Sequence, residues 1–141
     1  MSRSRFFLDC LKKHASATDL FLSGLSYHVF EGIPSVQEVT CTGRRLSADA
    51  KLVSITLFSL RERDHQLACV TLLLKPSCST SDVFSSCDVD ENDSRNTVLK
   101  TLVTDLRPGE AREYGCNVTL LKMGAQTETR LWSVRVQRPS E

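Results

Sequence analysis

The cysteines of this chain could bind a metal, form disulfides or stay reduced. There are six of them, at positions 10, 41, 69, 78, 87 and 116. Zinc sites usually contain close pairs such as Cys-x2-Cys, whereas the nearest cysteines here are nine positions apart. An even number of cysteines in a domain of ordinary size favours disulfides formed in an oxidising compartment. Cysteines that stay reduced for structural reasons are the remaining alternative.

Groups that could catalyse a reaction are few and scattered. The three histidines, His14, His28 and His65, fall in segments of different character. No Gly-x-Ser-x-Gly elbow, phosphate-binding glycine loop or His-Glu-x-x-His pattern occurs in the sequence. A cysteine nucleophile with a distant histidine partner is conceivable, but structural cysteines explain the pattern better. We therefore expect a protein that is not an enzyme and needs no cofactor.

The acidic stretch at residues 88–93 superficially suggests a calcium site. It lacks the glycine and the terminal glutamate of an EF-hand loop, so we expect a solvated acidic loop and no bound metal.

Two sequons, at Asn92 and Asn117, are candidate glycosylation sites and favour an extracellular protein. The N-terminus offers only three apolar residues before Asp9, too few for a signal peptide. We expect a fragment, one domain of a larger secreted protein, or an incorrectly started gene model.

Length and composition indicate one soluble domain. The chain has 141 residues, of which 40% are hydrophobic and 25% charged. Its net charge of +1 comes without a basic stripe, so no nucleic-acid partner is expected. No apolar run is long enough to span a membrane.

A period of two from residue 25 onward predicts strands, after a leader in which residues 5–14 could form a short helix. The expected strands span residues 27–30, 36–42, 52–60, 67–74, 97–103, 113–122 and 129–138. Residues 75–95 are polar, with low strand propensity, and predict a long loop. A local bridge between Cys78 and Cys87 would hold this loop, which leaves Cys10 and Cys69 to pair or to remain free.

Five residues at fixed spacing carry a family resemblance: Leu106, Pro108, Glu110, Tyr114 and Cys116. Their order resembles the corner that leads into strand F of immunoglobulin domains. The resemblance implies an all-β, immunoglobulin-like β-sandwich over residues 25–138, between a leader at 1–24 and a tail or linker at 139–141. It also implies an inter-sheet disulfide between Cys116 and Cys41, and an outward-facing Asn117 beside it.

The chain departs from the family pattern at two places. Arg112 stands where the family often has a small residue, and no tryptophan follows Cys41 at the usual distance. Ile55 or Val53 then takes the place of the core tryptophan of strand C. We expect Trp132 to supply the missing core volume, with a ligand-facing aromatic side chain as the alternative.

The resemblance implies an extracellular recognition or adhesion module, in the style of the immunoglobulin-like modules of molluscan fibrinogen-related lectins, which act in immune recognition. We expect a protein or glycan partner to bind a sheet face that is left exposed, with an outward-facing Phe58 beside Arg61 and Arg63 and the apolar run at 70–74. The competing expectation is that residues 5–23 of the same chain cover this face. The alternative function is a structural spacer in a longer parent chain with further domains.

Overall fold

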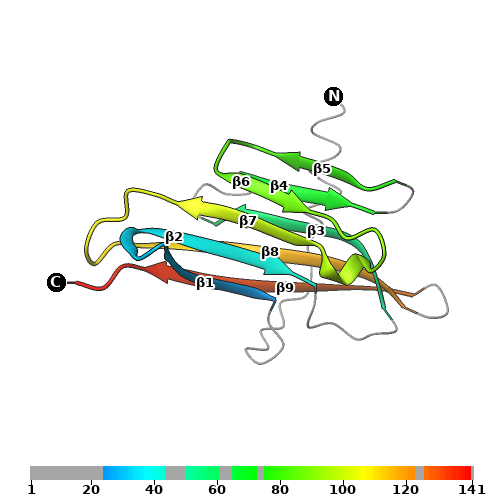
Figure 1. The fold of residues 1–141 in the computed structure, drawn as a ribbon. Coiled ribbons are helices and arrows are strands. Elements are labelled where there is room, and N and C mark those ends of the chain that lie inside the picture. The colour runs from blue at the N-terminus through cyan, green and yellow to red at the C-terminus, as the bar shows by residue number, and fades with distance from the viewer. Residues whose placement is uncertain (1–23, 44–49, 61–64, 73–74, 123–125, 141) are drawn as a thin grey trace.

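The chain folds as a sandwich of two antiparallel β-sheets (Figure 1). The computed structural model describes residues 24–43, 50–60, 65–72, 75–122 and 126–140. One sheet contains, in spatial order, β1 (Leu25–Phe30), β2 (Ile33–Thr42), β7 (Val98–Val103) and β6 (Ser85–Asp88). The other contains β5 (Ser77–Thr80), β4 (His65–Thr71), β3 (Lys51–Ser59), β8 (Ala111–Lys122) and β9 (Gln126–Gln137).

The strand order confirms the expected immunoglobulin-like sandwich and adds its type. In the described part of the chain, the sheets have four and five strands, nine in all. Variable-type immunoglobulin domains have this arrangement, because two extra strands join the edge of the sheet formed by strands G, F and C. Here β4 and β5 occupy that edge. The helix expected at residues 5–14 lies outside the described residues, and within them the only helical element is the 3-10 turn η1 (Ser94–Asn96).

Alternating side chains of the strands form the core between the sheets. Ile55 and Leu57 of β3 stand opposite Val118 and Cys116 of β8, and all four are fully buried. Trp132 of β9 is 1% exposed within the same core, which confirms that it fills the volume left by the aliphatic β3.

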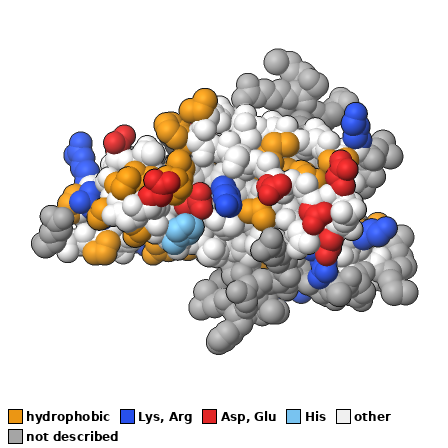
Figure 2. Space-filling model, in the orientation of Figure 1, with side chains coloured by type: hydrophobic (Ala, Val, Ile, Leu, Met, Phe, Trp, Pro, Cys, Tyr) orange, Lys and Arg blue, Asp and Glu red, His pale blue; other side chains and the backbone are white. Residues whose placement is uncertain are grey.

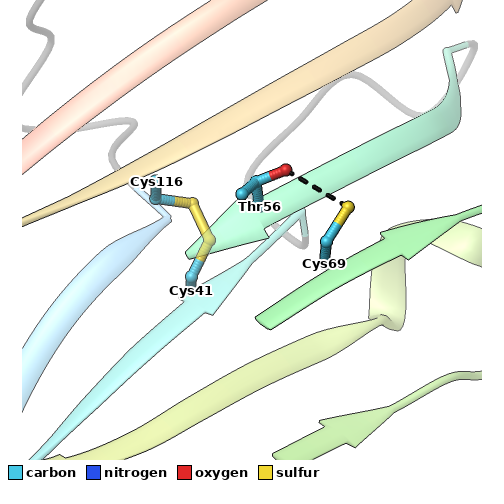
Figure 3. The surroundings of a disulfide bond; sticks show 4 residues. All are labelled: Cys41, Thr56, Cys69 and Cys116. Atoms are coloured by element: carbon cyan, nitrogen blue, oxygen red, sulfur yellow. Dashed lines mark hydrogen bonds between the residues drawn. A yellow bond between two sulfur atoms is a disulfide. The ribbon is translucent and has the colours of Figure 1, made fainter. Parts of the chain in front are cut away.

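Two disulfides match the sequence-based expectations. Cys41 of β2 and Cys116 of β8 are bonded across the sheets, with their Cα atoms 5.9 Å apart (Figure 3). Cys78 of β5 and Cys87 of β6 are bonded with a Cα separation of 6.2 Å. This second disulfide joins edge strands of the two different sheets. Cys69 is also disulfide-bonded, but its pairing and that of Cys10 lie outside the described residues.

The expectation of a structureless loop at residues 75–95 is wrong. This segment contains β5, β6 and η1. The two strands are four residues each and largely exposed, so they lack the apolar alternation by which a strand is recognised. Their pairing partners β4 and β7 determine their conformation, together with the disulfide between them.

The turn between β1 and β2 also differs from its predicted boundary. Glu31 and Gly32 both have positive φ angles, of 50° and 75°, and this turn lets β2 begin at Ile33 rather than at residue 36. Pro34 lies inside β2 without loss of a ladder bond to β7, because β7 pairs with β2 only from Gln37 onward.

Candidate functional site

The surface predicted around Phe58 is not open to solvent. Phe58 points to the outer face of the five-stranded sheet, but it is only 7% exposed and its ring lies over Gly115 of β8. The expectation of an exposed aromatic anchor is therefore wrong. Arg61 and Arg63 lie outside the described residues, as does Leu74. Within the apolar run, Val70 is buried in the core and Leu72 packs against it, so neither presents an exposed patch.

The neighbours of Phe58 on the outer face of the five-stranded sheet are also buried. Thr56 and Cys69 are 0% exposed, and the Thr56 hydroxyl donates a hydrogen bond to the Cys69 sulfur at 3.5 Å (Figure 3). Asn117 stands opposite Thr56 on this outer face, as the alternation predicts, yet it is only 4% exposed. A glycan on Asn117 would have no room in this arrangement. Asn92 lies in an exposed loop, and its glycosylation stays a prediction.

A charged hollow lies at the opposite end of the sandwich from the β3–β4 turn. We call this region the loop end; it comprises the connection from β6 to β7 at residues 89–97, the start of β3 and the end of β4. The hollow has a volume of about 560 Å³ and is lined by Ala50, Lys51, Leu52, Leu72, Pro76 and residues 90–95. Figure 2 shows acidic and basic side chains mixed at this end of the molecule.

Hydrogen bonds within residues 90–96 hold the wall of the hollow in shape. The Asp90 carboxylate accepts from the backbone N–H of Asn92 at 2.8 Å and from the Asn96 side-chain amide at 3.2 Å. The Leu52 backbone N–H donates to the Ser94 hydroxyl at 3.1 Å. The last bond ties the connection to β3, so the loop is fixed against the five-stranded sheet.

Asp93 and Arg95 form the principal ion pair of this loop. The Arg95 side chain donates to both Asp93 carboxylate oxygens, at 2.9 and 3.3 Å, and its backbone N–H donates to one of them at 3.1 Å. These hydrogen bonds, with that of the Arg95 side chain the strongest, lower the pKa of Asp93 from its ordinary value of 3.8. Asp93 is therefore ionised at neutral pH and caps the 3-10 turn that follows it.

A second charged group flanks the β8–β9 connection at the same end. Glu128 of β9 forms ion pairs with Lys122 of β8 and with Arg130 of its own strand. Its pKa is lowered, first by the hydrogen bond from Lys122 and also by the charge of Arg130. The loop end thus presents fixed charges of both signs.

The acidic composition of residues 88–93 predicts a solvated loop and does not reveal the structured wall of the hollow. The side chain of an aspartate often accepts a hydrogen bond from the backbone N–H of the residue two positions later. The spacings from Asp90 to Asn92 and from Asp93 to Arg95 are the sequence signal from which this wall could have been predicted. In the described part of the chain, no three histidine, cysteine or acidic side chains are grouped as metal ligands. The Asp90 and Asp93 oxygens instead accept hydrogen bonds from within the loop.

The strand order and the inter-sheet disulfide together define an immunoglobulin-like domain of variable type. No protein-family model matches the chain, and no curated protein matches it. Among solved structures, the fold is similar to that of murine CRIg, with 10% identity, a TM-score of 0.48, and coverage of 83% of this chain and 98% of that chain. A likeness with a TM-score below 0.5 supports no argument about fold or function, so the function must be argued from the residues of the chain itself.

Proposed function

We propose that this domain is an extracellular recognition module that binds a protein or glycan through the loop end. The hollow bounded by Lys51, Leu72 and residues 90–95 carries the proposal. It combines fixed charges with a half-buried apolar side chain, Leu72, in a concave surface. Binding sites for small groups on a partner commonly have this form, in which a few polar groups fix the orientation of the bound group.

The fixed shape of the loop supports recognition. A loop that is ordered before binding loses less conformational entropy on binding, so more of the contact energy appears as affinity. The bonds from Asp90, Asp93 and Ser94 order residues 90–96 without a ligand. Hydroxyl-rich or charged partners suit the lining, because Lys51 and Glu91 can donate and accept hydrogen bonds there.

An extracellular setting agrees with the disulfides. Disulfides such as Cys41–Cys116 and Cys78–Cys87 form and persist in oxidising compartments. In the part of the chain that the structure describes, no helix is long and apolar enough to cross a membrane. We propose that this binding serves immune recognition or adhesion, and that the domain is one part of a longer parent chain.

A structural spacer is the second candidate function, and Asn92 is the observation that favours it. Asn92 lies in the lining of the hollow and is exposed. A glycan attached there would occupy the concave surface and block a partner. The occupancy of Asn92 therefore separates the two functions.

A binding assay with matched variants tests the proposal. The full chain, produced in a secretory host, would be applied to protein and glycan arrays beside Lys51→Gln and Lys100→Gln. Both lysines are exposed, but Lys51 lines the hollow and Lys100 lies on the four-stranded sheet. We expect Lys51→Gln to weaken binding to the selected partner about fivefold or more, as for an interface residue worth about 1 kcal/mol. Equal binding by all three proteins, or no ligand at all, would favour the spacer.

A further inference from the structure

β1 (Leu25–Phe30) forms one margin of the four-stranded sheet, with β2 as its neighbour (Figure 1). In the described part of the chain, no strand pairs with the other side of β1. Residues 26–29 are all exposed, and the exposed fractions of Tyr27 and Val29 are 37% and 43%. This margin of the sheet therefore presents large apolar side chains to solvent.

The other edge strands of the described residues carry features that hinder pairing with another molecule. β5 and β6 have four residues each, and the disulfide Cys78–Cys87 joins them. β9 carries three charged side chains, Glu128, Arg130 and Arg135. Short length and charge are common means by which edge strands avoid association. β1 has six residues and contains no proline, lysine, arginine, aspartate or glutamate, so it lacks this protection.

The hydrogen-bond pattern shows which backbone groups of β1 face the margin. The Thr42 backbone N–H donates to the Gly24 carbonyl at 2.9 Å, so these two residues form a hydrogen-bonded pair. Such pairs alternate with non-hydrogen-bonded pairs along an antiparallel ladder. The N–H and C=O groups of His28 therefore point to β2, whereas those of Tyr27 and Val29 point away from it.

We propose that two copies of this chain associate through antiparallel pairing of β1, about a two-fold axis beside His28. In this register Tyr27 stands opposite Val29 of the second copy and exchanges two backbone hydrogen bonds with it. The symmetric pair makes two more, as an isologous interface requires. An aromatic side chain opposite a β-branched one is also a favourable cross-strand pair. The edge is complementary to itself, and for this reason the occupant that it fits is a second copy.

The outer face of β1 is compatible with this register. The His28 Nε2 atom lies 3.5 Å from a carboxylate oxygen of Glu38, and Lys100 Nζ lies 3.9 Å from the same oxygen. At the axis the two His28 side chains stand opposite each other, each beside its own Glu38. The two carboxylates offset the repulsion between the imidazole rings when these are protonated.

Antiparallel pairing fixes how the two domains point. The loop ends of the two copies face in opposite directions, because the second copy is reversed about the axis. The wall of the hollow follows β6, at the margin of the sheet opposite β1, so pairing leaves both hollows open. One consequence rests on the proposed function: the dimer would bind two different partner molecules, as a module that bridges two surfaces requires.

Sedimentation of the full chain without any ligand tests the association. One short strand per copy gives an interface smaller than the about 1,200–2,000 Å² of stable complexes, so we expect a weak dimer that forms at about 10–100 µM. Val29→Pro removes an N–H that faces the margin and keeps the ladder with β2, so it should raise the dissociation constant about tenfold or more.

A charge at the axis provides a second variant with a matched control. His28→Lys places two ammonium groups opposite each other and should also weaken the dimer about tenfold or more. Ser77→Lys adds the same charge on the exposed edge strand β5 and should leave the dimer unchanged. A monomer at about 1 mM, or a dimer that neither Val29→Pro nor His28→Lys weakens, would overturn the proposal.

Engineered cysteines test the register. In His28→Cys the two new cysteines stand opposite each other, with Cα atoms about 4.5 Å apart, which is within the range of a disulfide. In Ser26→Cys they are four residues apart along the paired strands, about 14 Å, which is too far. Oxidation should therefore give a covalent dimer of His28→Cys alone, seen on a non-reducing gel. Equal yields from the two variants would contradict the register. Because no ligand takes part, failure here is separate from failure of the proposed function.

Discussion

Phe58 of β3 lies over Gly115, its paired residue on β8, so closely that a Cβ on Gly115 would be 2.5 Å from the ring Cζ atom. The glycine leaves a gap in the sheet surface, and the aromatic ring of the neighbouring strand fills it. This contact explains why an aromatic side chain that faces outward is 7% exposed. Gly115 is required here by close approach, since its φ angle is not in the positive region.

Gly115→Ala should displace the Phe58 ring and destabilise the domain. A methyl group at this position overlaps three ring carbons, at 2.5, 2.7 and 3.1 Å. Overpacking of this kind typically costs about 1–3 kcal/mol in the free energy of unfolding. Denaturant unfolding, followed by the fluorescence of Trp132, would measure the loss.

A double-mutant cycle would attribute that loss to the ring. With Phe58→Leu as the background, Gly115→Ala should cost clearly less, because the clashing ring carbons are absent. The same cost in both backgrounds would mean that the methyl group disturbs the backbone of β8 instead.

Much of the fold could be predicted because the strongest patterns are local. The spacing that ends in Tyr114 and Cys116 identified the corner, and alternation identified the long strands of the sheets. The edge strands β5 and β6 could not be found in this way, because they are held by neighbours distant in the sequence. Alternation also predicts only which face a side chain points to. It placed Phe58 and Asn117 on the outer face correctly, but it carries no information on what covers that face.

The loop end was harder to predict than the fold. Its wall depends on the bond between Leu52 and Ser94, residues 42 positions apart, and nothing in the local sequence indicates that contact. The acidic composition of residues 88–93 favoured a solvated loop, whereas Asp90 and Asp93 are used as hydrogen-bond acceptors within it.

Trp132→Ala should be among the most destabilising single changes in the core. The indole is 1% exposed and pairs across the strands with Cys116, next to the inter-sheet disulfide. Removing a buried tryptophan typically costs about 3–5 kcal/mol, and Trp132→Phe should cost less because it leaves a smaller cavity. Circular dichroism during denaturant unfolding would measure both variants, and a cost below about 1 kcal/mol for the alanine would contradict a core role.

The two described disulfides should differ in what they contribute. Cys41–Cys116 closes a loop of 75 residues and Cys78–Cys87 one of nine. Loop-closure entropy gives about 4.5 kcal/mol for the first and about 2.6 kcal/mol for the second. Paired Cys→Ala variants, compared by denaturant unfolding, should follow that order. The reverse order would show that the edge disulfide matters through native contacts between the sheets.

The Asp93–Arg95 pair should be visible in an acid titration. Because the folded-state pKa of Asp93 lies below 3.8, its ionised form stabilises the loop above pH 3.8, and this contribution is lost as the pH falls through the lowered value. Arg95→Gln should raise the pKa of Asp93 toward 3.8, as measured by NMR of the side-chain carboxyl carbon. The carboxyl group of Glu128 pairs with other residues and should titrate unchanged in this variant. An unmoved Asp93 would mean that the backbone N–H, and not the guanidinium, controls its pKa.

Glycosylation should distinguish the two sequons of the chain. Asn92 is exposed at the loop end, whereas Asn117 is 4% exposed in the middle of β8. A glycan on Asn117 would have to displace whatever buries the outer sheet face, so the folded, secreted protein should carry no sugar at Asn117, whereas Asn92 is accessible to a glycan. Intact mass before and after glycosidase treatment should show at most one glycan, absent from Asn92→Gln and unchanged in Asn117→Gln. If the arrays then show stronger binding by Asn92→Gln than by the parent, the glycan and the partner compete for the same hollow. A glycan on Asn117 would contradict the burial of this face.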